Sequence, residues 1–177
     1  WGSFLLGSLL KADIVARNRR PVSSGSRNYG EGRIETINVS EVGSEFDDLW
    51  ARKIGEKMQL FSYRTADALK WHFGGQSAKI LRYSRNQQLV GYAVVATDDS
   101  YSLGLTRSRI VDIFVDQDDP EVIDELISAA YHHAQENGSC VLEVIGFPRN
   151  IRERVLRRRP YSRRTPNSYL YFAKDPV

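Results

Sequence analysis

The amino-acid sequence predicts an α/β (α+β) domain in which a mixed, twisted sheet carries helices on both faces. Two β-rich runs, at 79–83 and 88–96, flank a short turn, which is typical of a hairpin. The segment 109–145 alternates strand, helix and strand, which implies a parallel strand pair with a right-handed crossover. The chain has 177 residues, 41% of them hydrophobic and 27% charged, so it can form a sizeable core.

The first 32 residues predict a helix and a linker that stand apart from this domain. Apolar residues recur at helical spacing through 1–17, and glycine, serine and proline are frequent in the stretch that follows. Because the chain begins with Trp1 and not with methionine, we expect 1–32 to be the remnant of an upstream region. The apolar face of its helix would pack against another domain. The α/β domain itself is expected to span 33–177.

That domain is expected to open with a strand at 33–42 and two helices. Ser44 can cap the first helix, whose buried face would consist of Phe46, Leu49, Trp50 and Ile54. The second helix would run over 65–73 and end at a pair of glycines. The hairpin follows, with its turn at 84–87, and a further strand is expected at 109–116.

The helix at 120–136 carries the clearest end signals. Asp119 can act as its N-cap, Pro120 suits the first helical position, and Asn137 and Gly138 suit the C-terminal end. The run 140–145 is almost entirely apolar, which predicts a strand covered on both faces. A short basic helix at 150–159 and a last strand at 168–173 complete the expected order.

Charge is distributed in two opposite blocks, although the net charge is +3. Residues 111–125 hold seven acidic side chains and no basic one, whereas 149–164 hold eight arginines and one glutamate. Guanidinium groups bind phosphates in a bidentate way, so Arg154, Arg157 and Arg158 are candidate ligands for a polyanion. The alternative is that these arginines pair with the acidic block. Nucleic acid is not the expected partner, because no known RNA-binding motif accompanies them.

Cysteine content and hydropathy limit the disulfides, metal sites and membrane-spanning helices that the sequence can form. Cys140 is the single cysteine of the sequence, which excludes a disulfide within it and a multi-cysteine zinc site, and we predict no metal site. No apolar run approaches the roughly 20 residues that a membrane-spanning helix needs. We therefore expect a cytoplasmic protein.

Three short patterns carry a resemblance to a known family. The run 89–94 (LVGYAV) places a glycine after a β-branched residue in a strand, and 110–116 (IVDIFVD) forms the next strand. Asn150 opens the last helix and is followed ten and eleven residues later by Pro160 and Tyr161. Together with the order of elements, these patterns resemble the GNAT N-acetyltransferase superfamily over 33–177. Many members of this superfamily carry two such domains in tandem. The start at Trp1, the docking helix within 1–17 and the degenerate loop described below resemble the second, degenerate domain of such a pair.

The resemblance implies a site for acyl-coenzyme A (acyl-CoA) between the fourth and fifth strands. Backbone groups of Ile113, Phe114 and Val115 would hold the pantetheine arm, and Asn150 would contact the same cofactor. The family places a Gln/Arg-x-x-Gly-x-Gly/Ala loop at the pyrophosphate, and Gln117 fits its first position. The loop is otherwise degenerate: Pro120 has no N–H to donate, and three acidic side chains would repel phosphate, namely Asp118, Asp119 and Glu121.

Two carboxylates are candidate catalytic groups. Asp112 and Glu143 lie on the two strands that would flank the cofactor, where either could act as general base for an amine. The alternative is that each points toward a rim of the sheet or pairs with an arginine from 149–164. Trp71 and His72 close the second helix, on the side where the resemblance implies the acceptor substrate. The alternative is that Trp71 and Phe73 lie in the core while His72 is exposed.

These observations favour an N-acyltransferase. It would transfer an acyl group from acyl-CoA (acetyl-CoA, for example) or another activated donor to the amine of a small molecule or peptide. One alternative is a non-catalytic domain that supports an upstream catalytic domain or forms a homodimer. Another is an arginine-rich module that binds polyanions.

Overall fold

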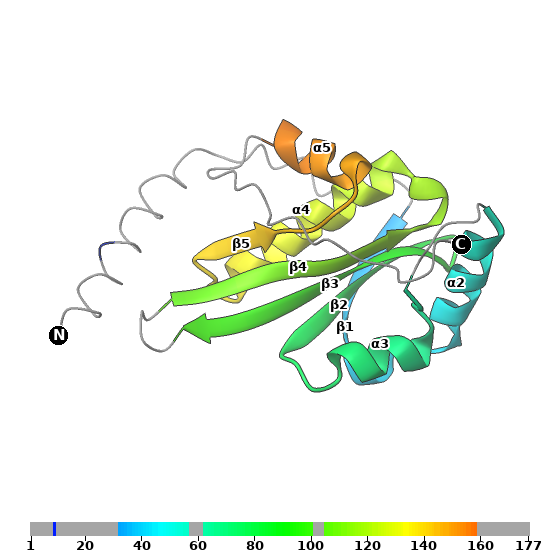
Figure 1. Ribbon diagram of the computed structural model, residues 1–177, viewed down its shortest axis with the longest axis horizontal. Coiled ribbons are helices and arrows are strands. Elements are labelled where there is room, and N and C mark those ends of the chain that lie inside the picture. Colours follow the sequence, from blue (N-terminus) through cyan, green and yellow to red (C-terminus); the bar gives the residue numbers. More distant parts are fainter. Residues whose placement is uncertain (1–8, 10–31, 57–61, 101–104, 159–177) are drawn as a thin grey trace, which may run out of the picture.

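The computed structural model describes Leu9 and residues 32–56, 62–100 and 105–158 (Figure 1). The predicted strand at 168–173 lies outside these residues. So do the predicted helix and linker at 1–32, apart from Leu9 and Gly32. The described elements are β1 (Gly32–Asn38), α2 (Ser44–Glu56), α3 (Ala66–Phe73), β2 (Ala78–Arg85), β3 (Gln88–Ser100), β4 (Leu105–Val115), α4 (Pro120–Glu136), β5 (Val141–Val144) and α5 (Arg149–Arg157).

These residues form a mixed sheet with the strand order β1-β2-β3-β4-β5. The first four strands pair antiparallel, whereas β4 and β5 pair parallel through the α4 crossover. The predicted hairpin is confirmed as β2 and β3. Its turn places Asn86 and Gln87 at φ values of 51° and 64°, as a tight hairpin turn requires. The mixed sheet expected from the sequence is therefore present.

Helices cover both faces of the sheet (Figure 1). On one face, α2 and α3 enclose a core that includes Phe46, Leu49 and Tyr92. On the other, α4 packs seven buried side chains against the sheet, and α5 adds Ile151. Strand residues alternate between the two cores, as the two-residue period of a strand requires.

Three details differ from the sequence-based expectations. The first strand ends at Asn38, because a short 3-10 helix (Val39–Glu41) with a capping box follows it. Ile54 was expected in the core but is 49% exposed, because the inner face of α2 continues from Trp50 to the buried Lys53. The run 140–145 was expected to be covered on both faces. Its strand is half-buried and Ile145 is exposed, since β5 ends the described strand order.

A β-bulge sets the orientation of the β4 side chains. Asp112 pairs with Val94 and Ile110 pairs with Val95, so Val111 is an extra residue in β4. The bulge directs Asp112 and Phe114 toward the α2/α3 core, while Ile113 and Val115 face α4. It thus places a buried carboxylate in the middle of the sheet.

Candidate functional site

The parallel ladder between β4 and β5 is short. It runs from Arg107 paired with Val141 to Ile110 paired with Val144, whereas β4 continues to Val115. Gly146, at φ 84°, turns the chain away from β4 and into α5. Among the described residues, no strand pairs with this edge of β4 over 111–115. We call this unpaired edge the β4 opening.

The candidate cofactor residues of β4 lie at this opening. The side chains of Ile113, Phe114 and Val115 are buried in the two cores. A ligand there would therefore meet backbone N–H and C=O groups, and of these only the ones on the edge away from β3, which alternate residues supply. Backbone groups at an open strand edge can pair with the amides of an extended ligand.

A cavity of about 570 Å³ lies between the start of α4 and α5. This volume is in the range of small-molecule sites, roughly 300–1,000 Å³. Asn150, a candidate from the sequence, is exposed and lines it. The full lining is Asp118, Pro120, Ile123, Pro148, Arg149, Asn150, Glu153, Arg154 and Arg157.

The first turn of α4 satisfies its own backbone donors. The Asp119 carboxylate accepts from Glu121 N at 2.9 Å and from Val122 N at 3.4 Å. Its backbone carbonyl accepts from Ile123 N at 3.1 Å, and Pro120 has no N–H. The helix end that could otherwise bind a phosphate is thus filled by a carboxylate of the chain itself.

Basic residues offset the acidic charges of the loop before α4. Arg52 contacts Asp116 at 3.0 Å, Lys53 contacts Asp118 at 3.0 Å, and Arg85 contacts Asp119 at 3.4 Å. Gln117 lies within this loop in the left-handed region, at φ 52°. The obstacle to a phosphate here is therefore the occupied helix end more than an excess of negative charge.

The arginines of α5 divide into two groups. Arg154 and Arg158 both contact Asp124 of α4, and Arg158 also donates to the Asp124 carbonyl at 2.6 Å. The expectation that the basic block pairs with the acidic block is confirmed for these two. Arg149 contacts Glu153 at 2.7 Å, whereas Arg157 is exposed and lines the cavity.

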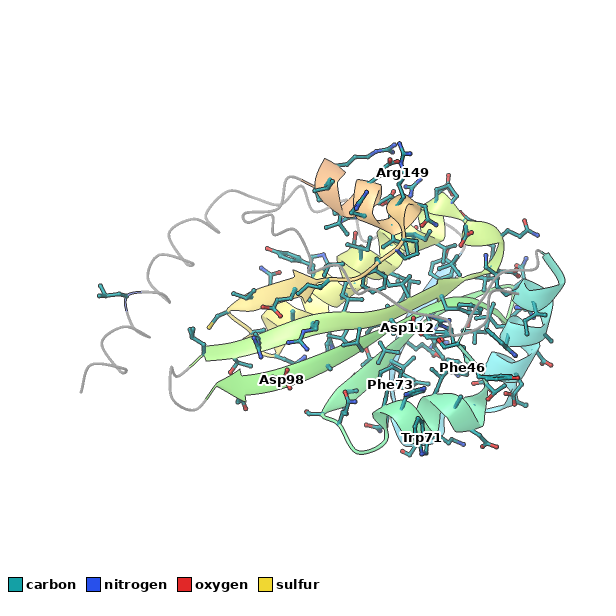
Figure 2. The ribbon with its side chains drawn as sticks, in the orientation of Figure 1. Phe46, Trp71, Phe73, Asp98, Asp112 and Arg149 are labelled. Atoms are coloured by element: carbon teal, nitrogen blue, oxygen red, sulfur yellow. The ribbon has the colours of Figure 1, made fainter. Side chains whose placement is uncertain are left out.

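Asp112 sits in a buried polar cluster on β4, labelled in Figure 2. Its Oδ2 accepts from Arg64 Nε at 2.9 Å and from the Tyr92 hydroxyl at 3.0 Å, and its Oδ1 accepts from Arg64 Nη2 at 3.0 Å. The guanidinium of Arg64 also lies 5.1 Å from the centre of the Phe114 ring. Asp112 is therefore paired with an arginine, but with one from outside the expected block at 149–164.

Burial and the charge of Asp112 shift the pKa values of its two partners. Burial, together with the charge of Asp112, raises the pKa of Tyr92 well above its usual 10, so Tyr92 stays a neutral donor. Burial alone would lower the pKa of Arg64, but the hydrogen bonds and the charge of Asp112 outweigh it and raise that pKa. The sequence analysis missed both residues, although the alternation of strand 88–96 could have indicated that Tyr92 is buried.

Glu143 lies at the paired end of β4 and β5, away from the opening. It contacts Arg109 at 3.2 Å and Arg107 at 3.8 Å, so its partners are not the arginines of 149–164 that the sequence suggested. Both arginines also approach Asp98, which Figure 2 shows toward the far end of β3. The structure therefore does not bring the two candidate carboxylates together.

Trp71 and His72 are both exposed on α3, and Trp71 is 80% exposed. The expected alternative of two core aromatics is therefore wrong for Trp71, whereas Phe73 packs against the core and His72 is exposed as that alternative required. Trp71 lies two positions after the buried Leu69, about 200° further round the helix, which puts it on the outer face, as Figure 2 shows. The centres of the two rings lie 4.7 Å apart, and the rings meet edge to face. In Figure 2, Trp71 points away from Asp112.

In the described part of the chain, no group of three or more His, Cys, Asp or Glu side chains is arranged to hold a metal ion. Among the same residues, no helix is both long and apolar enough to cross a bilayer.

Comparisons with known proteins identify the fold. No protein-family model matches the sequence, and no curated protein matches it significantly. Among solved structures, an aminoglycoside acetyltransferase from an uncultured soil metagenomic sample, in complex with sisomicin, superposes with a TM-score of 0.63. Its identity is 15%, and the match covers 84% of this chain and all of that one.

Other acetyltransferases give similar matches. The ribosomal-protein-alanine N-acetyltransferase of Brucella melitensis has a TM-score of 0.58 and 17% identity, covering 80% of this chain and 99% of that one. Glucosamine-6-phosphate N-acetyltransferase of Arabidopsis thaliana has a TM-score of 0.57 and 12% identity, with the same coverage. The domain therefore has the GNAT acyltransferase fold, as the sequence resemblance implied.

Proposed function

We propose that this domain is an N-acyltransferase. It transfers an acyl group from acyl-CoA, or another acyl thioester, to an amine of a small molecule or peptide. The observation that carries the proposal is the β4 opening: over 111–115, β4 pairs with β3 on one edge, while no described strand pairs with its other edge beyond Ile110. An extended amide-bearing arm such as pantetheine can pair with such an edge.

The chain fits one part of acyl-CoA and not another. The β4 opening suits the pantetheine arm, and Asn150 borders the adjoining cavity. The start of α4 does not suit a diphosphate, because Asp119 already occupies its amides. When bound, acyl-CoA would supply a thioester whose carbonyl carbon an amine can attack.

We assign Asp112 the role of taking a proton from the acceptor amine. An attacking amine becomes acidic as its new bond forms, so a carboxylate held beside a guanidinium is a sufficiently strong base. Arg64 and Tyr92 would act as positioning residues, because their hydrogen bonds fix both carboxylate oxygens. Glu143 has no part in this step, since it lies at the paired end of the sheet.

The acceptor class is an amine, and the reaction is proposed to take place in the cytoplasm. Solved structures of this fold include enzymes named for amine acceptors, among them the aminoglycoside acetyltransferase. Trp71 and His72 would meet an acceptor only at the outer face of α3, so we place them at the periphery of the substrate path. The single cysteine suits a reducing compartment.

One observation favours a second function. The Asp119 cap leaves the start of α4 without free amides for a diphosphate, as expected of a domain that has lost its cofactor. Such a domain would be non-catalytic and would support an upstream catalytic domain or a second copy. It would show no transfer from any thioester.

Thiol release during incubation with amines separates the two functions. The full chain would be given acetyl-CoA or acetyl-pantetheine as donor, with aminoglycosides, polyamines and peptide N-termini as acceptors. We expect transfer to at least one acceptor, and Asp112→Asn should lower kcat about 100-fold with little change in KM. Glu143→Gln, a matched loss of one carboxylate, should keep most of the activity.

A second variant guards against a folding artefact. Asp112→Asn leaves Arg64 without its partner, so Arg64→Gln/Asp112→Asn, which removes both charges, should fold more stably and stay equally inactive. Absence of transfer by the unaltered chain from both donors would contradict the proposal and favour the non-catalytic domain.

A further inference from the structure

We propose that Arg157 and Arg149 of α5 bind the phosphate groups of the acyl donor, in place of the backbone amides at the start of α4. This inference rests on the proposed function, because it concerns the donor of that reaction. It assigns a phosphate subsite to side chains that point into the cavity between α4 and α5.

The start of α4 is closed to a second anion. Its three N–H groups from Glu121 to Ile123 already donate to Asp119, two of them to the carboxylate and one to the carbonyl. A phosphate would have to displace a carboxylate that Arg85 also holds. Any phosphate of an acyl donor lying in the β4 opening must therefore take its hydrogen bonds from groups other than these amides.

The α5 side of the cavity offers those donors. Arg149, Arg154 and Arg157 line it, but Arg154 is held by Asp124. In the described part of the chain, Arg157 forms no ion pair, and its side chain is exposed to the cavity. A guanidinium presents parallel N–H groups that match two phosphate oxygens. Arg157 is therefore the principal phosphate ligand.

Arg149 is a second ligand whose charge is shared. It contacts Glu153 at 2.7 Å, and that hydrogen bond lowers the pKa of Glu153, which thus stays ionised and competes with a phosphate. The other acid on the cavity, Asp118, is held by Lys53. Removal of the Glu153 charge would release Arg149 and strengthen phosphate binding.

The size of the cavity selects the kind of ligand. About 570 Å³ accommodates a phosphorylated small molecule or the phosphate end of a coenzyme, and not a nucleic-acid duplex. The cavity lies where Pro148, Arg149 and Asn150 follow β5, beyond the end of the β4–β5 ladder. A single extended donor could thus occupy both the opening and the cavity.

Calorimetric titration of the full chain tests the assignment. The probes are CoA, pantetheine (the same arm without phosphates) and inorganic diphosphate. We expect CoA to bind at least about tenfold more tightly than pantetheine, since hydrogen bonds to charged groups are the stronger ones. Arg157→Gln should weaken CoA binding about tenfold and leave pantetheine unchanged.

Arg152→Gln is the matched control, because Arg152 is exposed on the same helix but does not line the cavity. It should change CoA affinity less than about twofold. Glu153→Gln should tighten CoA binding about threefold by freeing Arg149. Circular dichroism would confirm that each variant is folded.

Three results would overturn the inference. They are equal losses from Arg157→Gln and Arg152→Gln, equal binding of CoA and pantetheine, or no gain from Glu153→Gln. The proposed function fails separately: transfer from acetyl-pantetheine needs no phosphate, so its presence with unaltered CoA binding in Arg157→Gln would reject this subsite alone.

Discussion

The two helices that border the cavity begin in opposite ways. At the start of α4, Asp119 fills the amides of the first turn. At the start of α5, the N-cap is Pro148, no side chain caps the helix, and arginines surround it. One helix has an internal anion and the other presents cations to the cavity. The difference teaches that a fold does not by itself fix the sign of the charge that the start of each helix presents.

The two helices also differ in how they are held. Seven buried side chains of α4 pack on the sheet, whereas in α5 only Ile151 is buried among the described residues. The other links of α5 to α4 include Arg154 and Arg158 on Asp124. The side of the cavity formed by α4 (the α4 wall) should therefore resist displacement. The side formed by α5 (the α5 wall) should move more easily.

The largest expected effect tests the rigidity of the α4 wall. A Cβ at Gly91 would lie 3.0 Å from Val115 Cγ2, 3.1 Å from Val122 Cγ1 and 3.2 Å from the Phe114 carbonyl. Gly91→Ala should therefore lower the free energy of unfolding by about 1–3 kcal/mol, as measured by urea denaturation.

Gly55→Ala is the control for this substitution. Gly55 lies in α2 with no atom within 4 Å of the added carbon, so alanine should stabilise by up to about 1 kcal/mol. A loss below about 0.5 kcal/mol for Gly91→Ala would mean that β4 and the start of α4 move aside easily at this contact, so that α4 would not be the rigid side of the cavity.

A smaller effect tests the Asp119 carboxylate that caps the start of α4. Asp119→Ala removes the cap and should lower the free energy of unfolding by about 1 kcal/mol, because two amides lose their acceptor. Asp119→Asn removes the same charge but keeps a side-chain oxygen for those amides, so it should cost less than about 0.5 kcal/mol.

The same two variants show whether the amides or the charge exclude phosphate. Calorimetry with CoA should give a larger gain in affinity for Asp119→Ala than for Asp119→Asn, since only alanine exposes the N–H groups. Equal gains would show that the charge of Asp119, and not its bonds to the amides, keeps phosphate away from the start of α4.

Local signals predicted much of the fold. Helix 120–136 was predicted with the bounds that α4 has, because Asp119, Pro120 and Gly138 fix its ends within a few residues. Ile54 was placed wrongly, because helical spacing alone does not show that Lys53 reaches Asp118 in a distant loop. The half-buried state of β5 depends on its place in the sheet, which no local pattern encodes.

The site was less accessible to sequence reasoning. The family resemblance indicated the β4 opening. Arg64, however, lies in a coil segment, and its pairing with Asp112 depends on the tertiary fold, which no local pattern shows. The partners of Glu143 were more accessible. Arg109 lies on the adjacent strand, where opposite charges commonly pair across a ladder, so the β4–β5 pairing could have suggested it.

The smallest expected effect tests the mobility of the α5 wall. Asp124→Asn removes the carboxylate that both Arg154 and Arg158 contact, while Arg158 keeps its bond to the Asp124 carbonyl. The pair is partly exposed, so the global free energy of unfolding should fall by no more than about 1 kcal/mol. Amide hydrogen exchange should quicken in α5 and stay unchanged in α4, because α4 keeps its buried face.

Asp48→Asn is the control for this last change, since Asp48 is an exposed acid on α2 with no ion pair in the described part of the chain. It should leave exchange in both helices unaltered. Equal acceleration in α4 and α5 after Asp124→Asn would mean that the two helices unfold as one unit. The arginines facing the cavity would then be held as rigidly as the acids opposite them, and an α5 phosphate site could not adjust to its ligand by moving alone.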